Sequence, residues 1–238
     1  MVSATSSPSV NVVYSITYKA GMSGGSENEG IPAPNVLLSG PISPGYLYMY
    51  SRASEYTFIS NDRVRRIFTS NETVNTLAGL LYPSLGYSGA TLVANGAEML
   101  PNGIAFNSTS GTEYLISDRG SCCIGSVSLT TGNITNFAGV CSSTCVNSYG
   151  YTEGANKNVA TFNLLSGLFY HASSGSVFVC DQGNNVVRRI AASGSVTTVA
   201  GIASSTGGYV DNVVATSGKL NTPNAVFVNA AGEVFISG

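Results

Sequence analysis

Four cysteines of the 238-residue chain lie close together in the sequence and could form disulfides or bind a metal: Cys122, Cys123, Cys141 and Cys145. They flank two predicted strands that meet at a turn at Thr131–Gly132. With a tight loop at this turn, Cys122 faces Cys141 and Cys123 lies near Cys145, but a slip of register gives the crossed pairing. Zinc is the alternative, and it is disfavoured because Cys141 and Cys145 are loosely spaced with no histidine nearby.

Two disulfides in this cluster indicate an oxidising compartment. The fifth cysteine, Cys180, ends a predicted strand and is expected to be a buried free thiol. Three Asn-x-Thr sequons, at Asn71, Asn107 and Asn133, fall at predicted hairpin turns where a glycan has room. Asparagine is also common in turns because of its own hydrogen bonding, which is the alternative explanation. We expect N-linked glycans at all three positions.

Groups suited to catalysis are few. His171 is the only histidine, and it lies on a predicted strand, where a single histidine is more typical of packing than of base catalysis. No Gly-x-Ser-x-Gly elbow, Walker motif or dinucleotide motif is present. Asp118 and Asp181 recur at equivalent strand ends, where a repeated carboxylate usually fixes a turn. Recurring arginines follow and are expected on the outer surface: Arg63, Arg65, Arg66, Arg188 and Arg189. The sequence therefore predicts no catalytic residue, no metal site and no cofactor.

The strands that position these residues follow a long repeat. An Ala-Gly pair ends a strand at positions 20–21, 78–79, 138–139 and 200–201, at intervals of 58, 60 and 62 residues. A nearly fixed period of this size indicates a solenoid, a propeller or a similar array. No stretch has a sustained helical period, so the prediction is an all-β fold with little helix.

Each repeat contains four short strands separated by Gly, Asn, Asp and Ser turns. The predicted blades span residues 45–79, 103–139 and 167–201, and a partial blade of two strands spans 225–238. A single strand, residues 9–21, precedes them. The whole chain, residues 1–238, is long enough to bury one core as a single domain. The predicted fold is a β-propeller-like array of four blades, the fourth shared between the N- and C-terminal strands.

The junction between the third and fourth repeats carries a resemblance to a known family. The segments DQGNNVVRRI at 181–190, VTTVAG at 196–201 and LNTP at 220–223 resemble the NHL-repeat β-propellers. The second repeat departs from this pattern, with Cys122, Cys123 and Gly125 at the Asn and Arg positions. The resemblance implies a propeller, but relatives include protein binders, RNA binders, hydrolases and lyases, so the fold alone selects no function. The histidine-rich metal site of the lyases and the calcium cage of the lactonases have no counterpart in this sequence.

The count of strands leaves the fourth blade one strand short. Residues 9–17 could bend and supply both the third and the fourth strand of this blade within one molecule, or the last strand could accept a strand from another chain. A head-to-tail contact between copies does not close by itself and extends into a filament. The residues expected to form it are Val10, Val12, Tyr14 and Ile16 on one strand, and Val234, Phe235 and Ile236 on the other.

The surface is expected to carry little charge. Only 9% of residues are charged, against roughly 25% in ordinary globular proteins, and the formal net charge is −2. This balance disfavours nucleic acid as a partner, and no run reaches the roughly 18 apolar residues of a membrane span. Residues 1–9 lack the basic and apolar regions of a signal peptide, so the cysteines and sequons favour an extracellular protein processed from a longer precursor.

The expected function is a non-enzymatic structural subunit that self-assembles as a homo-oligomer or homopolymer. The first alternative is a ligand- or protein-binding propeller module of a larger secreted protein. The second alternative is a propeller-type hydrolase or lyase.

Overall fold

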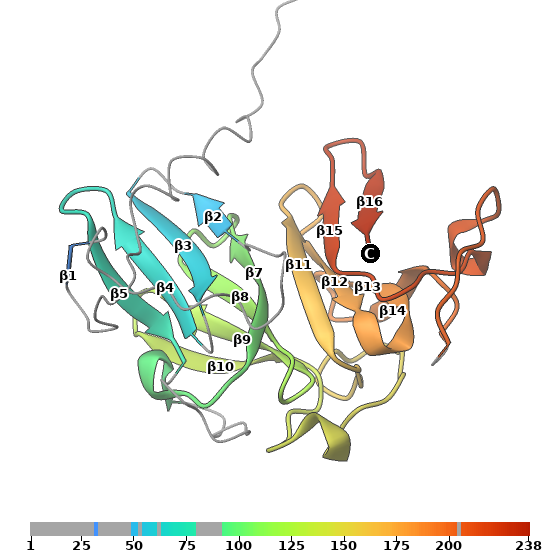
Figure 1. The fold of residues 1–238 in the computed structure, drawn as a ribbon, viewed down its shortest axis with the longest axis horizontal. Coiled ribbons are helices and arrows are strands. Elements are labelled where there is room, and N and C mark those ends of the chain that lie inside the picture. The colour runs from blue at the N-terminus through green and yellow to red at the C-terminus, as the bar shows by residue number, and fades with distance from the viewer. Residues whose placement is uncertain (1–30, 33–48, 52–53, 61–62, 80–91, 204–205) are drawn as a thin grey trace, which may run out of the picture.

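The computed structural model describes residues 31–32, 49–51, 54–60, 63–79, 92–203 and 206–238 (Figure 1). In these ranges the protein is all-β: four antiparallel sheets fan out side by side, and no α-helix occurs. The predicted all-β fold class is thereby confirmed, and the side-by-side sheets are consistent with a propeller-like array. Whether the array closes into a ring depends on residues 9–21, which lie outside the described part of the chain.

The strands alternate with short turns, as the sequence predicted. The first sheet contains β2 (Met49–Ser51), β3 (Glu55–Ser60), β4 (Arg63–Phe68) and β5 (Thr73–Ala78). The second contains β7 (Pro101–Asn107), β8 (Glu113–Asp118), β9 (Cys123–Ser128) and β10 (Asn133–Ala138). The third contains β11 (Leu165–His171), β12 (Ser176–Asp181), β13 (Val186–Ile190) and β14 (Val196–Ala200). The fourth has β15 (Ala225–Val228) and β16 (Val234–Ser237).

The connection that precedes each complete sheet also covers its outer edge. Strand β1 (Ile31–Pro32) pairs with β5, and β6 (Leu92–Val93) pairs with β10. In the third sheet, an isolated bridge joins Gly154 to Val196 at the start of β14. Each of these contacts occupies the first one or two residues of the outer strand, so the outer edge is partly covered.

The connections also contain single 3₁₀ turns. These are η2 (Ala94–Gly96), η3 (Cys145–Asn147), η4 (Gln182–Asn184) and η5 (Ala215–Ser217). The glycine of each described Ala-Gly pair directs the chain into the next connection. Gly79, Gly139 and Gly201 have φ of 97°, 97° and 90°, a conformation that favours glycine. Their N–H groups donate to the carbonyls of Ala94, Lys157 and Ala215. The repeated Ala-Gly motif therefore forms the turn by which the chain leaves each sheet.

The core lies between neighbouring sheets rather than on one face of each. One apolar cluster joins the first and second sheets through Val64, Ile104 and Ile116, among others. A second cluster joins the second and third sheets, and a third joins the third sheet to β15 and β16. Buried Tyr114 adds a polar link between the first two sheets, because its hydroxyl donates to Glu55 at 3.0 Å. Each sheet therefore needs a neighbour on both faces to bury its apolar side chains.

Candidate functional site

Two disulfides fasten the start of β9 to the connection that follows β10. The structure joins Cys122 to Cys145 and Cys123 to Cys141, with Cα–Cα distances of 4.9 and 5.2 Å. This is the crossed pairing, not the pairing predicted from a tight two-residue loop. The pairing of Ile134 with Val127 shows a longer turn, and a bulge between Asn136 and Ala138 shifts the register again.

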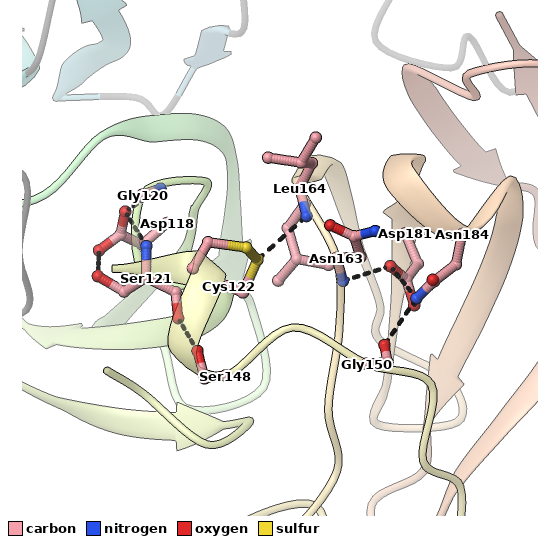
Figure 2. Close-up of a disulfide and its surroundings, with 12 residues drawn as sticks. Asp118, Gly120, Ser121, Cys122, Ser148, Gly150, Asn163, Leu164, Asp181 and Asn184 are labelled. Atoms are coloured by element: carbon pink, nitrogen blue, oxygen red, sulfur yellow. Dashed lines mark hydrogen bonds between the residues drawn. A yellow bond between two sulfur atoms is a disulfide. The ribbon is translucent and has the colours of Figure 1, made fainter. Parts of the chain in front are cut away.

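In the second sheet, the sulfur of Cys122 accepts the hydrogen bond that the side chain of Asn185 accepts at the equivalent place in the third sheet. Figure 2 shows the backbone N–H of Leu164 pointing at Cys122 Sγ, at a distance of 3.1 Å. In the third sheet, the N–H of Thr222 donates in the same way to Asn185 Oδ1 at 2.8 Å. All four residues have positive φ, between 46° and 56°. The second repeat thus keeps the contact although it departs from the sequence pattern.

Asp118 and Asp181 are buried turn-fixing carboxylates, the role that their recurrence predicted. Asp118 Oδ1 accepts hydrogen bonds from the N–H groups of Leu100 and Gly120 at 3.0 and 2.9 Å. Burial raises the pKa of Asp118, although these hydrogen bonds and those from Ser121 act to lower it. Every acceptor position seen here faces backbone or side chains of the fold itself, so the carboxylate serves structure.

Asp181 lies at the equivalent place in the third sheet. Its carboxylate accepts from the N–H of Asn163 at 2.7 Å and from Asn184 Nδ2 at 2.9 and 3.0 Å (Figure 2). Burial raises its pKa to about 6, against the lowering influence of these hydrogen bonds and of Arg188. The carboxylate thus ties the connection before β11 to the strand β12.

The arginines predicted on the outer surface include two that are fully buried. Arg65 and Arg188 are 1% and 0% exposed, and Arg63 is also buried at 8%, so that prediction was wrong for all three. Arg188 stacks on Tyr151, with Cζ 4.5 Å from the ring centroid, and its Nε lies 3.9 Å from Glu153 Oε1. Its Nη2 also donates to the carbonyl of Thr152 at 2.9 Å. The connection between sheets, not solvent, therefore surrounds this guanidinium.

Sequence reasoning missed Tyr151 and Glu153. A signal was present, because Gly150-Tyr151-Thr152-Glu153 recurs as Gly208-Tyr209-Val210-Asp211 at an interval of 58 residues. Burial opposes ionisation of Glu153, but hydrogen bonds from Thr198 and the charge of Arg188 outweigh it and lower the pKa of Glu153.

The sequon asparagines differ in their surroundings. Asn71 is exposed in the β4–β5 turn, and its Oδ1 accepts from Thr73. Asn107 ends β7, and its Nδ2 donates to Glu113 at 3.2 Å. Asn133 begins β10 and faces Val93 of β6. All three side chains reach the surface at least partly.

The remaining reactive side chains are not brought together. His171 ends β11 at a turn, and its two ring nitrogens contact Ser174 Oγ at 2.8 Å and Ser173 Oγ at 3.1 Å. Cys180 is a buried free thiol, as predicted, and burial raises its pKa to about 12. Among the described residues, no group of three or more His, Cys, Asp or Glu side chains could hold a metal ion.

The edge of β16 is the open end of the array. Within the described ranges β16 pairs only with β15, and no strand lies on its other edge. Val234 and Ile236 are half-buried against the third sheet, whereas Phe235 is 54% exposed. Phe235 contacts Phe227, which is 52% exposed, with ring centroids 6.0 Å apart. Three of the predicted assembly residues are thus placed at this edge, and the four on residues 10–16 lie outside the described part of the chain.

No protein-family model matches the sequence, and no curated protein matches it. Several solved structures are similar in fold. A Bacteroides thetaiotaomicron protein of unknown function matches 81% of this chain with a TM-score of 0.61 and 17% identity, over 44% of its own length. A second protein of that organism, provisionally described as a phosphatase, matches 76% with a TM-score of 0.52 and 15% identity, over 43% of its length.

Virginiamycin B lyase from Staphylococcus aureus matches 84% of this chain with a TM-score of 0.46 and 14% identity, over 51% of its length. The chain thus spans about half the length of these structures or less, and at such identities the likeness concerns the fold alone. No helix in the described ranges has the length and apolar character needed to cross a membrane.

Proposed function

We propose that this protein is a non-enzymatic, extracellular structural subunit of the NHL-repeat propeller type, which self-assembles by β-strand complementation. The observation that carries the proposal is that the edge of the last strand, β16, differs from the outer edges of the three complete sheets. The outer edges of the three complete sheets are partly covered by β1, β6 and the Gly154 bridge, whereas the edge of β16 has no partner strand in the described ranges. An open, apolar edge is a template for another strand.

The donor in this proposal is the strand Ser9–Tyr18 of another copy. Its apolar residues alternate, so that Val10, Val12, Tyr14 and Ile16 share one face of an extended strand. Strand addition at β16 supplies main-chain hydrogen bonds and burial of apolar surface. Because the donor and acceptor are different surfaces, the contact is heterologous and leads to a homopolymer.

Two disulfides support an extracellular location, since such pairs persist in oxidising compartments. N-linked glycans at Asn71, Asn107 and Asn133 belong to this proposal. They would cover parts of a surface that carries few charges.

A mixing experiment tests the proposal. A variant lacking residues 1–18 keeps the acceptor edge and loses the donor, whereas Ile236→Pro keeps the donor and blocks the edge. Each variant alone is expected to be monomeric by light scattering, and an equimolar mixture is expected to form a heterodimer. Circular dichroism establishes that both variants are folded. If the intact protein is monomeric at every concentration and the truncated protein unfolds, the ring closes within one chain and the proposal is wrong.

A second candidate is a ligand- or protein-binding module in a larger secreted propeller. The observation that favours it is the exposed face of Phe227 and Phe235, where a further blade would pack, together with the greater length of the similar structures. In that case the mixture above stays monomeric. A propeller-type hydrolase or lyase is the third candidate, and no grouping of the described side chains supports it.

A further inference from the structure

Two connections of the fold have the same backbone structure. Gly150 N–H donates to the carbonyl of Phe162 at 3.1 Å, and Gly208 N–H donates to the carbonyl of Leu220 at 3.1 Å. Thr152 bridges Thr161, and Val210 bridges Lys219. Each pair of equivalent residues is 58 positions apart in the sequence. Residues 208–220 therefore repeat the arrangement of residues 150–162.

The first of these connections holds an arginine of the strand β13. Tyr151 lies under the guanidinium of Arg188, Glu153 is its second carboxylate partner after Asp181, and Thr152 accepts a hydrogen bond from it. Tyr151 also contacts Thr198 of β14 through its hydroxyl, at 2.6 Å. The Tyr-x-acidic segment thus clamps the third and fourth strands of its sheet.

The second connection presents the same groups to solvent. Tyr209 and Asp211 stand where Tyr151 and Glu153 stand in the first. Tyr209 is 73% exposed, against 41% for Tyr151, and its hydroxyl accepts a hydrogen bond from Asn221 Nδ2 at 3.3 Å. Asp211 is exposed, and no ion pair joins it to a residue in the described ranges. In Figure 1 this connection lies to the right of β14 and β16.

We propose that Tyr209, Asp211 and the free edge of β16 form a docking site for an arginine-bearing β-strand. The register follows from the third sheet, where Arg188 faces Val179 across β12 and β13. Leu168 pairs with Val179, and Val226 pairs with Ile236, so Ile236 is the equivalent of Val179. The incoming arginine pairs opposite Ile236, with its guanidinium over the ring of Tyr209 and beside the carboxylate of Asp211.

This inference rests on the open edge that carries the proposed function, but it specifies a different donor. Residues 1–18 contain no arginine and no lysine, so the strand Ser9–Tyr18 fills the edge without supplying a cation. The charge of Asp211 and the face of Tyr209 favour a partner strand that carries a guanidinium.

The chain itself provides the probe. A fluorescently labelled peptide with the sequence of residues 185–201, NVVRRIAASGSVTTVAG, reproduces β13 and β14. Its binding to the variant lacking residues 1–18, whose β16 edge no strand of another copy fills, is measured by fluorescence anisotropy and compared with its binding to the intact protein. A peptide with Arg188→Ala is expected to bind about tenfold more weakly, through loss of the cation–π contact and the ion pair. The matched control is a peptide with Arg189→Ala, whose residue faces the opposite side of the strand, and it is expected to bind within about twofold of the parent.

Variants of the protein, combined with the peptide variants, complete a double-mutant cycle. Asp211→Asn and Tyr209→Ala are expected to weaken binding of the parent peptide several-fold and to leave binding of the Arg188→Ala peptide unchanged. Equal affinities of the parent and Arg188→Ala peptides, or no binding of the parent peptide, overturn the arginine site. If Ile236→Pro abolishes binding while Asp211→Asn has no effect, strand addition stands and the arginine site falls. If the peptide binds in an Asp211-dependent manner while the truncated and Ile236→Pro variants fail to associate, the arginine site stands and self-assembly falls.

Discussion

Arg188 donates from Nη1 to Asp181 Oδ2 at 3.1 Å, and neither side chain has any exposed surface. Removing one partner of a buried pair leaves the other without compensation. Arg188→Ala is therefore expected to lower the free energy of unfolding by about 3–5 kcal/mol in urea titrations at pH 7. Arg189→Ala, at the half-buried neighbour, is the matched control and is expected to cost less than about 1 kcal/mol. Equal losses of unfolding free energy in the two variants would show that the buried pair contributes no more to stability than a half-buried arginine does.

Stability is expected to depend on pH through the buried carboxylates. The pKa of Asp181 in the folded protein is raised to about 6, mainly by burial, so the folded state holds its proton to higher pH than the unfolded state. The stabilisation is fully present below the unfolded pKa of 3.8 and is lost as pH rises through about 6. Asp118 acts in the same direction, because burial raises its pKa as well.

The measurement is the free energy of unfolding in urea between pH 4 and pH 7. In the wild-type protein, this carboxylate is expected to lower that free energy with rising pH, by an amount on the order of 2 kcal/mol. Asp181→Asn is expected to remove the part of this pH dependence that comes from Asp181 and to leave the part that comes from Asp118. A slope that is identical in the variant would show that Asp181 titrates normally.

The sequence predicted the strands well because their hairpins are local. Alternating apolar residues and Gly, Asn and Asp turns specify each hairpin without information from elsewhere in the chain. The two-residue strands β1 and β6 were not predicted, since two residues carry no alternation pattern. Their pairing is decided by where a connection happens to lie.

The features of the candidate site depend on strand register and on contacts between residues that are distant in the sequence. The disulfide connectivity was left open because a bulge between Asn136 and Ala138 changes the register, and bulges have no reliable sequence signal here. The burial of Arg188 was missed because two of its partners, Tyr151 and Glu153, lie on a connection rather than on a neighbouring strand. Only the recurrence of the Tyr-x-acidic segment pointed to them.

The two disulfides are expected to stabilise the protein non-additively, because their loops are nested. The loop closed by Cys122 and Cys145 contains the one closed by Cys123 and Cys141. With either bond intact, the other closes only a short additional loop. Replacing one pair by serines is therefore expected to cost about 2 kcal/mol, and replacing both pairs about 5 kcal/mol. Urea unfolding of the three variants measures this, and a double replacement that costs no more than the sum of the two single replacements would contradict it.

Glycan occupancy is expected to differ among the sequons when the protein is made in a secretory host. Asn71 lies exposed in a turn, whereas the amide of Asn107 bonds Glu113 and Asn133 lies beside β6. Peptide mapping by mass spectrometry should find Asn71 the most fully occupied. Thr73→Ala is the matched control, since it removes the Asn71 sequon without changing the asparagine. An unmodified Asn71 beside occupied Asn107 and Asn133 would show that exposure does not govern the order.

Gly201 and Gly111 form a test of the Ala-Gly turn. Both have positive φ, of 90° and 69°, so alanine is strained at either position. A Cβ at Gly201 would also lie 2.5 Å from the carbonyl oxygen of Asn185 and 3.0 Å from the Cα of Val186, whereas one at Gly111 meets nothing within 4 Å. Gly111→Ala is expected to cost about 1 kcal/mol, and Gly201→Ala more than about 3 kcal/mol, because backbone must move to admit the methyl group. Thermal and urea unfolding measure both, and a Gly201→Ala variant as stable as Gly111→Ala would show that the turn relaxes freely and that the repeated glycine is not required for packing.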